Sequence, residues 1–66
     1  MQSTQNKISN ETRGELVSTT DMKRARLLGR RVSIKQILAG RLAHFEVIDT
    51  GVLLYAGREL YELKTV

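Results

Sequence analysis

The chain has 66 residues, no cysteine and a formal net charge of +4 at pH 7. A chain of this length forms one small domain with a marginal core, and without cysteine it has neither disulfides nor thiolate metal ligands. No apolar run approaches the roughly 20 residues needed to span a bilayer, and the N-terminus lacks the apolar core of a secretory signal, so we expect a soluble, cytoplasmic protein.

The N-terminal segment is polar. Met1 and Ile8 are the only large apolar side chains among the first fifteen residues. Such a segment buries too little surface to offset the entropy lost on ordering. We therefore predict a disordered polar arm over residues 1–15 and a small α+β domain over residues 16–66. The arm is either an inert tail or a segment that orders on a partner.

The next segment carries the signals of a first helix. Ser18, Thr19 and Thr20 are candidate N-caps, Asp21 suits the first turn, and Gly29 suits a left-handed C-terminal position. The lysine and arginines between them are good helix formers. These signals predict a helix over about residues 20–28.

A second helix start follows at Ser33. Ser33 and Gln36 have the spacing of a capping box, and the apolar residues that follow lie on one face of a helix: Ile34, Ile37, Leu38, Leu42 and Phe45. The pattern predicts a helix over residues 33–39, which extends to 43 if Gly40 lies inside it. The alternative is a strand over residues 32–38, although the adjacent Ile37 and Leu38 break the two-residue alternation.

The C-terminal third is rich in β-branched and aromatic residues separated by glycines. It predicts a strand over residues 45–48, a turn over 49–51 in which Gly51 is able to take a positive φ, and a return strand over 52–55. A third, edge strand is predicted over 59–63. The expected fold class is therefore α+β, with two short N-terminal helices followed by a β-hairpin or three-stranded antiparallel meander. We expect a homodimer in which the third strand pairs across a two-fold axis.

Positive charge is concentrated in the middle of the chain. Residues 22–45 contain seven lysines and arginines and no acidic residue, whereas residues 1–21 sum to −1 and residues 46–66 to −2. A basic block between mildly acidic ends concentrates a positive field on one part of the surface. This asymmetry indicates an acidic partner, either nucleic acid or protein.

Two short helices followed by a hairpin resemble the helix-turn-helix regulators that carry a β-wing. Ala25, four positions before Gly29, matches the small residue of that motif, but Arg24, Arg30 and Lys35 occupy places where the motif has apolar residues. Over about 20 residues the C-terminal half is similar to the Cro family of repressors, at Ala39-Gly40-Arg41, Gly51 and Tyr55-Ala56. This resemblance implies that the second helix enters the major groove of DNA.

We therefore expect a small, non-enzymatic nucleic-acid-binding regulatory protein, with DNA favoured over RNA. The candidate binding residues are Lys23, Arg24, Arg26, Arg30, Arg31, Lys35, Gln36 and Arg41. The alternative is a protein-interaction module, such as a phage- or plasmid-type inhibitor or adaptor that docks on an acidic protein. We expect no cofactor and no catalytic site, because the single His44 has no obvious paired nucleophile and cannot hold a metal alone.

Overall fold

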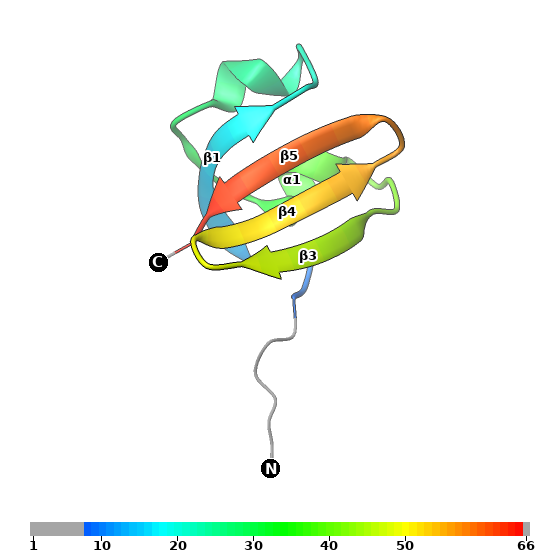
Figure 1. Ribbon diagram of the computed structural model, residues 1–66. Coiled ribbons are helices and arrows are strands. Elements are labelled where there is room, and N and C mark those ends of the chain that lie inside the picture. The colour runs from blue at the N-terminus through cyan, green and yellow to red at the C-terminus, as the bar shows by residue number, and fades with distance from the viewer. Residues whose placement is uncertain (1–7, 66) are drawn as a thin grey trace.

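The computed structural model of the protein describes residues 8–65. Its elements in chain order are β1 (Arg13–Thr19), the single 3₁₀ turn η1 (Arg24–Leu27), β2 (Arg31–Ser33), α1 (Ile34–Leu38), β3 (His44–Ile48), β4 (Gly51–Ala56) and β5 (Glu59–Lys64). The five strands form one sheet in the order β2-β1-β5-β4-β3, and all neighbouring strands are antiparallel. Figure 1 shows α1 behind one face of this sheet and η1 beyond the end of β1.

The core lies between α1 and the covered face of the sheet. It contains ten buried side chains, with Ile34, Ile37 and Leu38 from the helix packing against residues of the strands. The strand residues are Leu16, Val32, Val52, Leu54, Ala56, Tyr61 and Leu63. Burial of this apolar surface is the main favourable contribution to folding, and Tyr61 is the largest side chain that is fully buried.

The predicted fold class is wrong, because the protein is mostly β rather than two helices followed by a hairpin. The segment predicted as a first helix, residues 20–28, forms only the four-residue turn η1. Of its side chains, Leu27 packs partly against the core and none is fully buried. A helix this short needs an apolar face packed on its neighbours to be stable, but Met22 and Leu28 of this segment are exposed and only Leu27 packs partly against the core.

Strand β1 includes residues that were predicted to belong to the polar arm and to the N-cap of the first helix. Residues 13–15 belong to β1, so order begins before residue 16, while residues 1–7 of the predicted arm lie outside the described residues. Only Gly14 and Leu16 of this strand are buried. With a single large apolar side chain facing the core, the sequence of β1 carries almost none of the alternation that identifies a strand.

The second helix was predicted correctly in place and start. Ser33 caps α1 and forms the reciprocal capping box with Gln36, as expected from their spacing. The helix ends after Leu38 because Ala39 and Gly40 both have positive φ, at 51° and 89°. The alternative strand over residues 32–38 is wrong beyond its first two residues, since β2 ends at Ser33.

The three C-terminal strands were also predicted, but their place in the sheet was not. β3, β4 and β5 form the expected meander. β5 lies between β4 and β1, so it is the central strand and not an edge. A dimer formed through an unpaired edge of β5, as the sequence suggested, is therefore excluded. None of the helices over residues 8–65 is long and apolar enough to cross a membrane.

Candidate nucleic-acid interface

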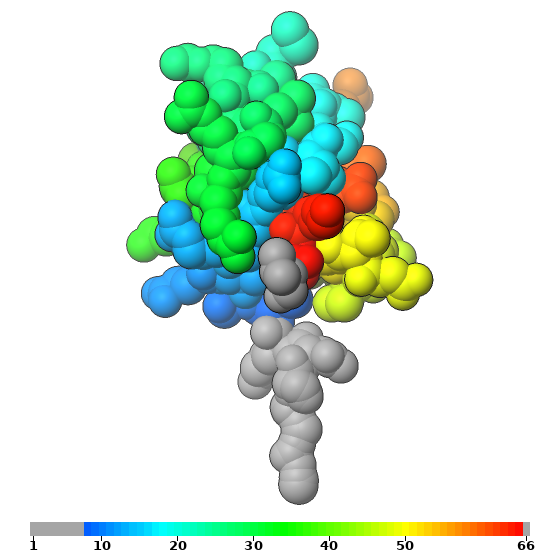
Figure 2. Space-filling model, turned by 90° about the vertical axis from the view of Figure 1, so that its left-hand side faces the viewer, coloured from blue at the N-terminus to red at the C-terminus, as the bar shows by residue number. Residues whose placement is uncertain are grey.

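Four of the predicted binding residues surround one hollow on the surface. Lys23, Arg24, Arg26 and Arg30 line it together with Leu27, and its volume is about 350 Å³. The residues of η1 and β2, coloured teal to green, form one continuous part of the surface on this side of the molecule (Figure 2). The structure thus gathers positive charge around η1 without the recognition helix that the sequence suggested.

Arg24 differs from its neighbours because it is already engaged. Its Nε donates a hydrogen bond to the main-chain carbonyl of Ile37 at 2.7 Å and lies 4.0 Å from Oδ2 of Asp21. Ile37 is in the last turn of α1, where unpaired carbonyls favour a cation. Arg24 therefore links η1 to the end of α1.

The remaining cations of this region are exposed and make no ion pair within residues 8–65. We call four of them the basic surface: Lys23, Arg26, Arg30 and Arg31. The main chain beside Arg30 is hydrogen-bonded to β1, since the Leu16 amide donates to the Arg30 carbonyl at 3.0 Å and the Gly29 amide to the Leu16 carbonyl at 2.7 Å. The four side chains are free for a partner, and the backbone of Arg30 and Arg31 is held by β1.

The structure places Lys35 and Gln36 on α1, outside the hollow around η1. Lys35 is exposed beside a shallow depression that is also lined by Arg13 and Ser33. Gln36 is exposed, but its side-chain oxygen accepts the Ser33 amide at 3.2 Å. That oxygen is needed for the bidentate contact of glutamine with adenine, so the capping box competes with base recognition.

Arg41 lies apart from the other candidates, in a network with three other side chains. Its guanidinium contacts the carboxylate of Glu59 and the hydroxyl of Tyr61, and it lies 4.0 Å from Oδ2 of Asp21. The Tyr61 hydroxyl is 2.6 Å from Oε1 of Glu59 and 3.1 Å from Oδ2 of Asp21. This network links Asp21, just before η1, and Arg41, just after α1, to β5. The guanidinium of Arg41 is thus already paired within the protein.

The network shifts the pKa values of its members. Burial, with the hydrogen bond to Glu59 next, raises the pKa of Tyr61 to about 12. Hydrogen bonds from Tyr61 and Arg41 lower the pKa of Glu59. Desolvation acts to raise the pKa of Asp21, but the Lys23 amide, Tyr61 and the two arginines outweigh it and lower the pKa. Both carboxylates therefore stay ionised at neutral pH.

We expect Tyr61 to ionise only near pH 12 in the folded protein, against an ordinary value of 10.0. The protonated hydroxyl contributes stability that is fully present below pH 10 and is lost as the pH rises through about 12. The measurement is a near-ultraviolet absorbance titration of a Tyr55→Phe variant, in which Tyr61 is the remaining tyrosine, with circular dichroism to confirm folding. A midpoint near 10 in folded protein would show that the network does not form.

Arg13 is the cation that the sequence analysis missed. It is exposed on β1 and pairs in register with Ser33 of β2, next to Lys35 of α1. Nothing local in the sequence signals this, because the proximity comes from strand pairing across twenty residues.

The described residues contain no group of three or more His, Cys, Asp or Glu side chains placed to hold a metal ion. Comparisons with protein-family models, curated proteins and solved structures found no match.

Proposed function

We propose that this chain is a small nucleic-acid-binding regulatory protein without catalytic activity, which contacts phosphates through the basic surface. The observation that supports this proposal is the set of four exposed cations around η1 and β2 that make no ion pair within residues 8–65. Arginine side chains bind phosphate oxygens through two parallel hydrogen bonds, and each neutralised phosphate releases condensed counterions.

The contacts are proposed to be with the backbone of the nucleic acid rather than with its bases. The only α-helix of the described residues, α1, is five residues long, and the oxygen of Gln36 is engaged in its cap. The resemblance to helix-turn-helix regulators fails for the same reason. Backbone contacts position a protein on nucleic acid without reading its sequence, so we expect similar affinity for duplexes of different sequence.

Duplex DNA is favoured over single-stranded RNA because few aromatic side chains are free to stack on bases. Tyr61 is buried and Phe45 is half-buried. Tyr55 is 38% exposed, but it lies beside Glu46, whose carboxylate accepts the Tyr55 hydroxyl at 3.3 Å. A negative charge at this position repels phosphate. Double-stranded DNA instead offers closely spaced phosphates to a compact group of cations.

We propose a cytoplasmic location, since a chain without cysteine gains no disulfide from an oxidising compartment. We also propose that the protein acts as a homodimer, because a domain of this size has a small core that a second copy would enlarge. One group of ionisable side chains is hydrogen-bonded among its own members: Asp21, Arg41, Glu59 and Tyr61. This arrangement supports a binding role for the protein rather than catalysis.

The test is fluorescence anisotropy with three labelled probes of equal charge: duplex DNA, single-stranded RNA and an acidic polypeptide. We expect the duplex to bind most tightly, at micromolar concentration or below in low salt, and two unrelated duplex sequences to bind alike. Tightest binding to the polypeptide would instead assign the basic surface to a protein partner. Failure of all three probes to bind would overturn the proposal.

A further inference from the structure

The two edges of the sheet differ in how well they are protected. β2 is three residues long and carries the exposed Arg31, and short charged edges resist pairing with other chains. β3 is five residues long, pairs with β4 without a register shift, and carries one exposed carboxylate, Glu46, but no lysine or proline. No strand of the described residues pairs with its other side. β3 is therefore the edge that is open to strand addition.

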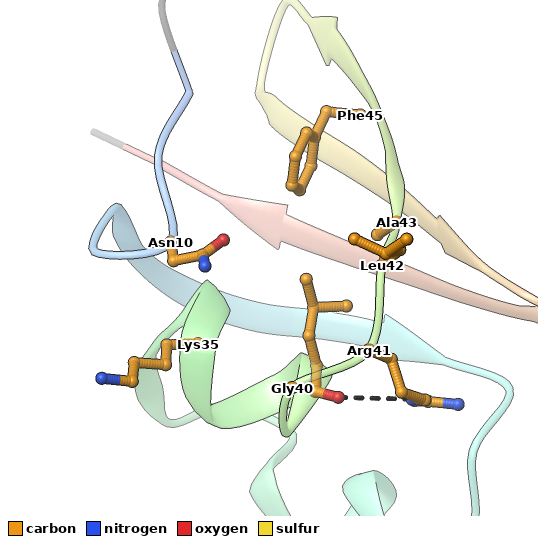
Figure 3. Close-up of a pocket in the computed structure, with 8 residues that line it drawn as sticks. Asn10, Lys35, Gly40, Arg41, Leu42, Ala43 and Phe45 are labelled. Carbon is orange, nitrogen blue, oxygen red and sulfur yellow. Dashed lines mark hydrogen bonds between the residues drawn. The ribbon is translucent and has the colours of Figure 1, made fainter.

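Exposed apolar side chains gather at the same edge. Leu42 is 95% exposed just before β3, and Val47 within it is 55% exposed. Phe45 points into a groove of about 250 Å³ that separates β3 from Asn10 and α1 (Figure 3). Large apolar side chains exposed together on an unpaired edge are typical of an interface.

We propose that β3 pairs antiparallel with β3 of a second copy, about a two-fold axis that passes through Phe45. In this register Phe45 lies opposite Phe45 of the partner subunit, and His44 lies opposite Glu46 of the partner subunit, twice. Directly opposite side chains share a face of the sheet and have Cβ atoms about 5 Å apart. Continued by one and two residues, the register sets Ala43 against Val47 and Leu42 against Ile48.

The neighbouring two-fold registers are less favourable, because each places either two carboxylates or an apolar side chain and a carboxylate opposite one another. An axis at Glu46 places two carboxylates face to face. An axis at Val47 places Phe45 opposite Asp49, and an axis at His44 places Leu42 opposite Glu46. Like charges directly opposite one another destabilise a strand pair. The Phe45 register alone matches apolar with apolar side chains and the imidazole with a carboxylate.

The proposed interface leaves the basic surface free. β2 and β3 are opposite edges of the sheet, so joining two β3 strands makes a continuous ten-stranded sheet with a β2 strand at each end. Nine strand spacings of about 4.8 Å separate these ends by roughly 40 Å along the sheet. The inference refines the homodimer of the proposed function but does not depend on nucleic-acid binding, and its test contains no nucleic acid.

Cysteine cross-linking tests the register, because the natural chain has no cysteine. Purified His44→Cys and Glu46→Cys chains are mixed and oxidised, and the products are identified by mass. We expect the mixed disulfide dimer as the main product, since opposite Cβ atoms are within reach of a disulfide. A dimer formed mainly by the Glu46→Cys chain with itself, or no disulfide dimer at all, would contradict the proposed register.

Sedimentation equilibrium tests the interface itself with two matched variants. Glu46 and Glu62 lie in one cross-strand row, each opposite Leu53 of β4, but Glu62 belongs to the central strand. We expect Glu46→Lys to weaken dimerisation at least about 10-fold, because the introduced ammonium would face the imidazole of His44 in place of a carboxylate. Glu62→Lys is expected to leave dimerisation unchanged. A wild-type chain that stays monomeric, or equal effects of the two variants, would overturn the proposal.

Discussion

Reversal of Arg26 and Arg30 together to glutamate is expected to weaken binding to duplex DNA about 100-fold or more. Each charge-assisted hydrogen bond to phosphate contributes about 1.5 kcal/mol or more, and two such losses correspond to about two factors of ten in affinity. Both side chains line the hollow around η1 and make no ion pair within residues 8–65. The measurement is anisotropy with one labelled duplex at fixed salt.

A matched control separates local contacts from the effect of net charge. Arg58 lies in the turn between β4 and β5, and Lys64 ends β5; both are exposed and neither belongs to the basic surface. The double variant Arg58→Glu with Lys64→Glu changes the net charge by the same amount. We expect it to weaken binding less than about 10-fold, through long-range electrostatics alone. Equal losses in the two double variants would remove the assignment to the basic surface.

Substitution of Gly51 by alanine is expected to destabilise the fold by about 3 kcal/mol or more. A Cβ at this position would lie 1.9 Å from the carbonyl oxygen of Leu63 and 2.9 Å from the amide nitrogen of Thr65. Both atoms belong to the main chain, so relief requires β4 and β5 to separate. A chain of this length has a total stability of roughly 3–10 kcal/mol, so this loss removes a large share of it.

Gly40→Ala is the control for this prediction. Gly40 has a φ of +89°, but a Cβ there would meet no atom within 4 Å. Its cost is therefore the conformational strain of alanine at positive φ, about 1 kcal/mol. Urea unfolding followed by circular dichroism measures both variants. A Gly51→Ala chain as stable as Gly40→Ala would mean that the close approach of β4 to β5 is absent.

Gly51 also shows where local reading of the sequence succeeds and where it stops. The sequence predicted the turn between β3 and β4, with Gly51 able to take a positive φ. The turn is present, but Gly51 is not among the glycines with positive φ. Glycine is required there because β5 passes close to its backbone, and that contact involves a strand more than ten residues away. A pattern of neighbouring residues cannot reveal it.

The same distinction explains the fold. The cap at Ser33 and the C-terminal meander depend on residues close together in the chain, and the sequence predicted them; it left open whether the helix ends before Gly40 or continues to residue 43. β1 is held by β5, with Thr19 opposite Tyr61 forty-two positions later. Its own residues do not alternate clearly, since the alternation breaks at a register shift between Leu16 and Ser18, after which Ser18 is exposed where a regular strand would turn it inward. Long-range pairing made this segment a strand.

The candidate site was predicted in its charge but not in its arrangement. The seven positive residues were visible in the sequence, and most of them are exposed. The sequence could not show that Arg24 is bound to Ile37, or that Arg41 is bound to Glu59 and Tyr61. These contacts divide the predicted set into cations that hold the fold and cations that are free for a partner.

The most direct test of phosphate binding by the basic surface is the salt dependence of duplex DNA binding by the wild-type chain. Four cations that each neutralise one phosphate predict a slope of about −3 to −4 for the logarithm of the association constant against the logarithm of salt concentration. Anisotropy titrations over a series of salt concentrations give this slope directly. A slope near zero, or no binding in low salt, would contradict phosphate contact by the basic surface.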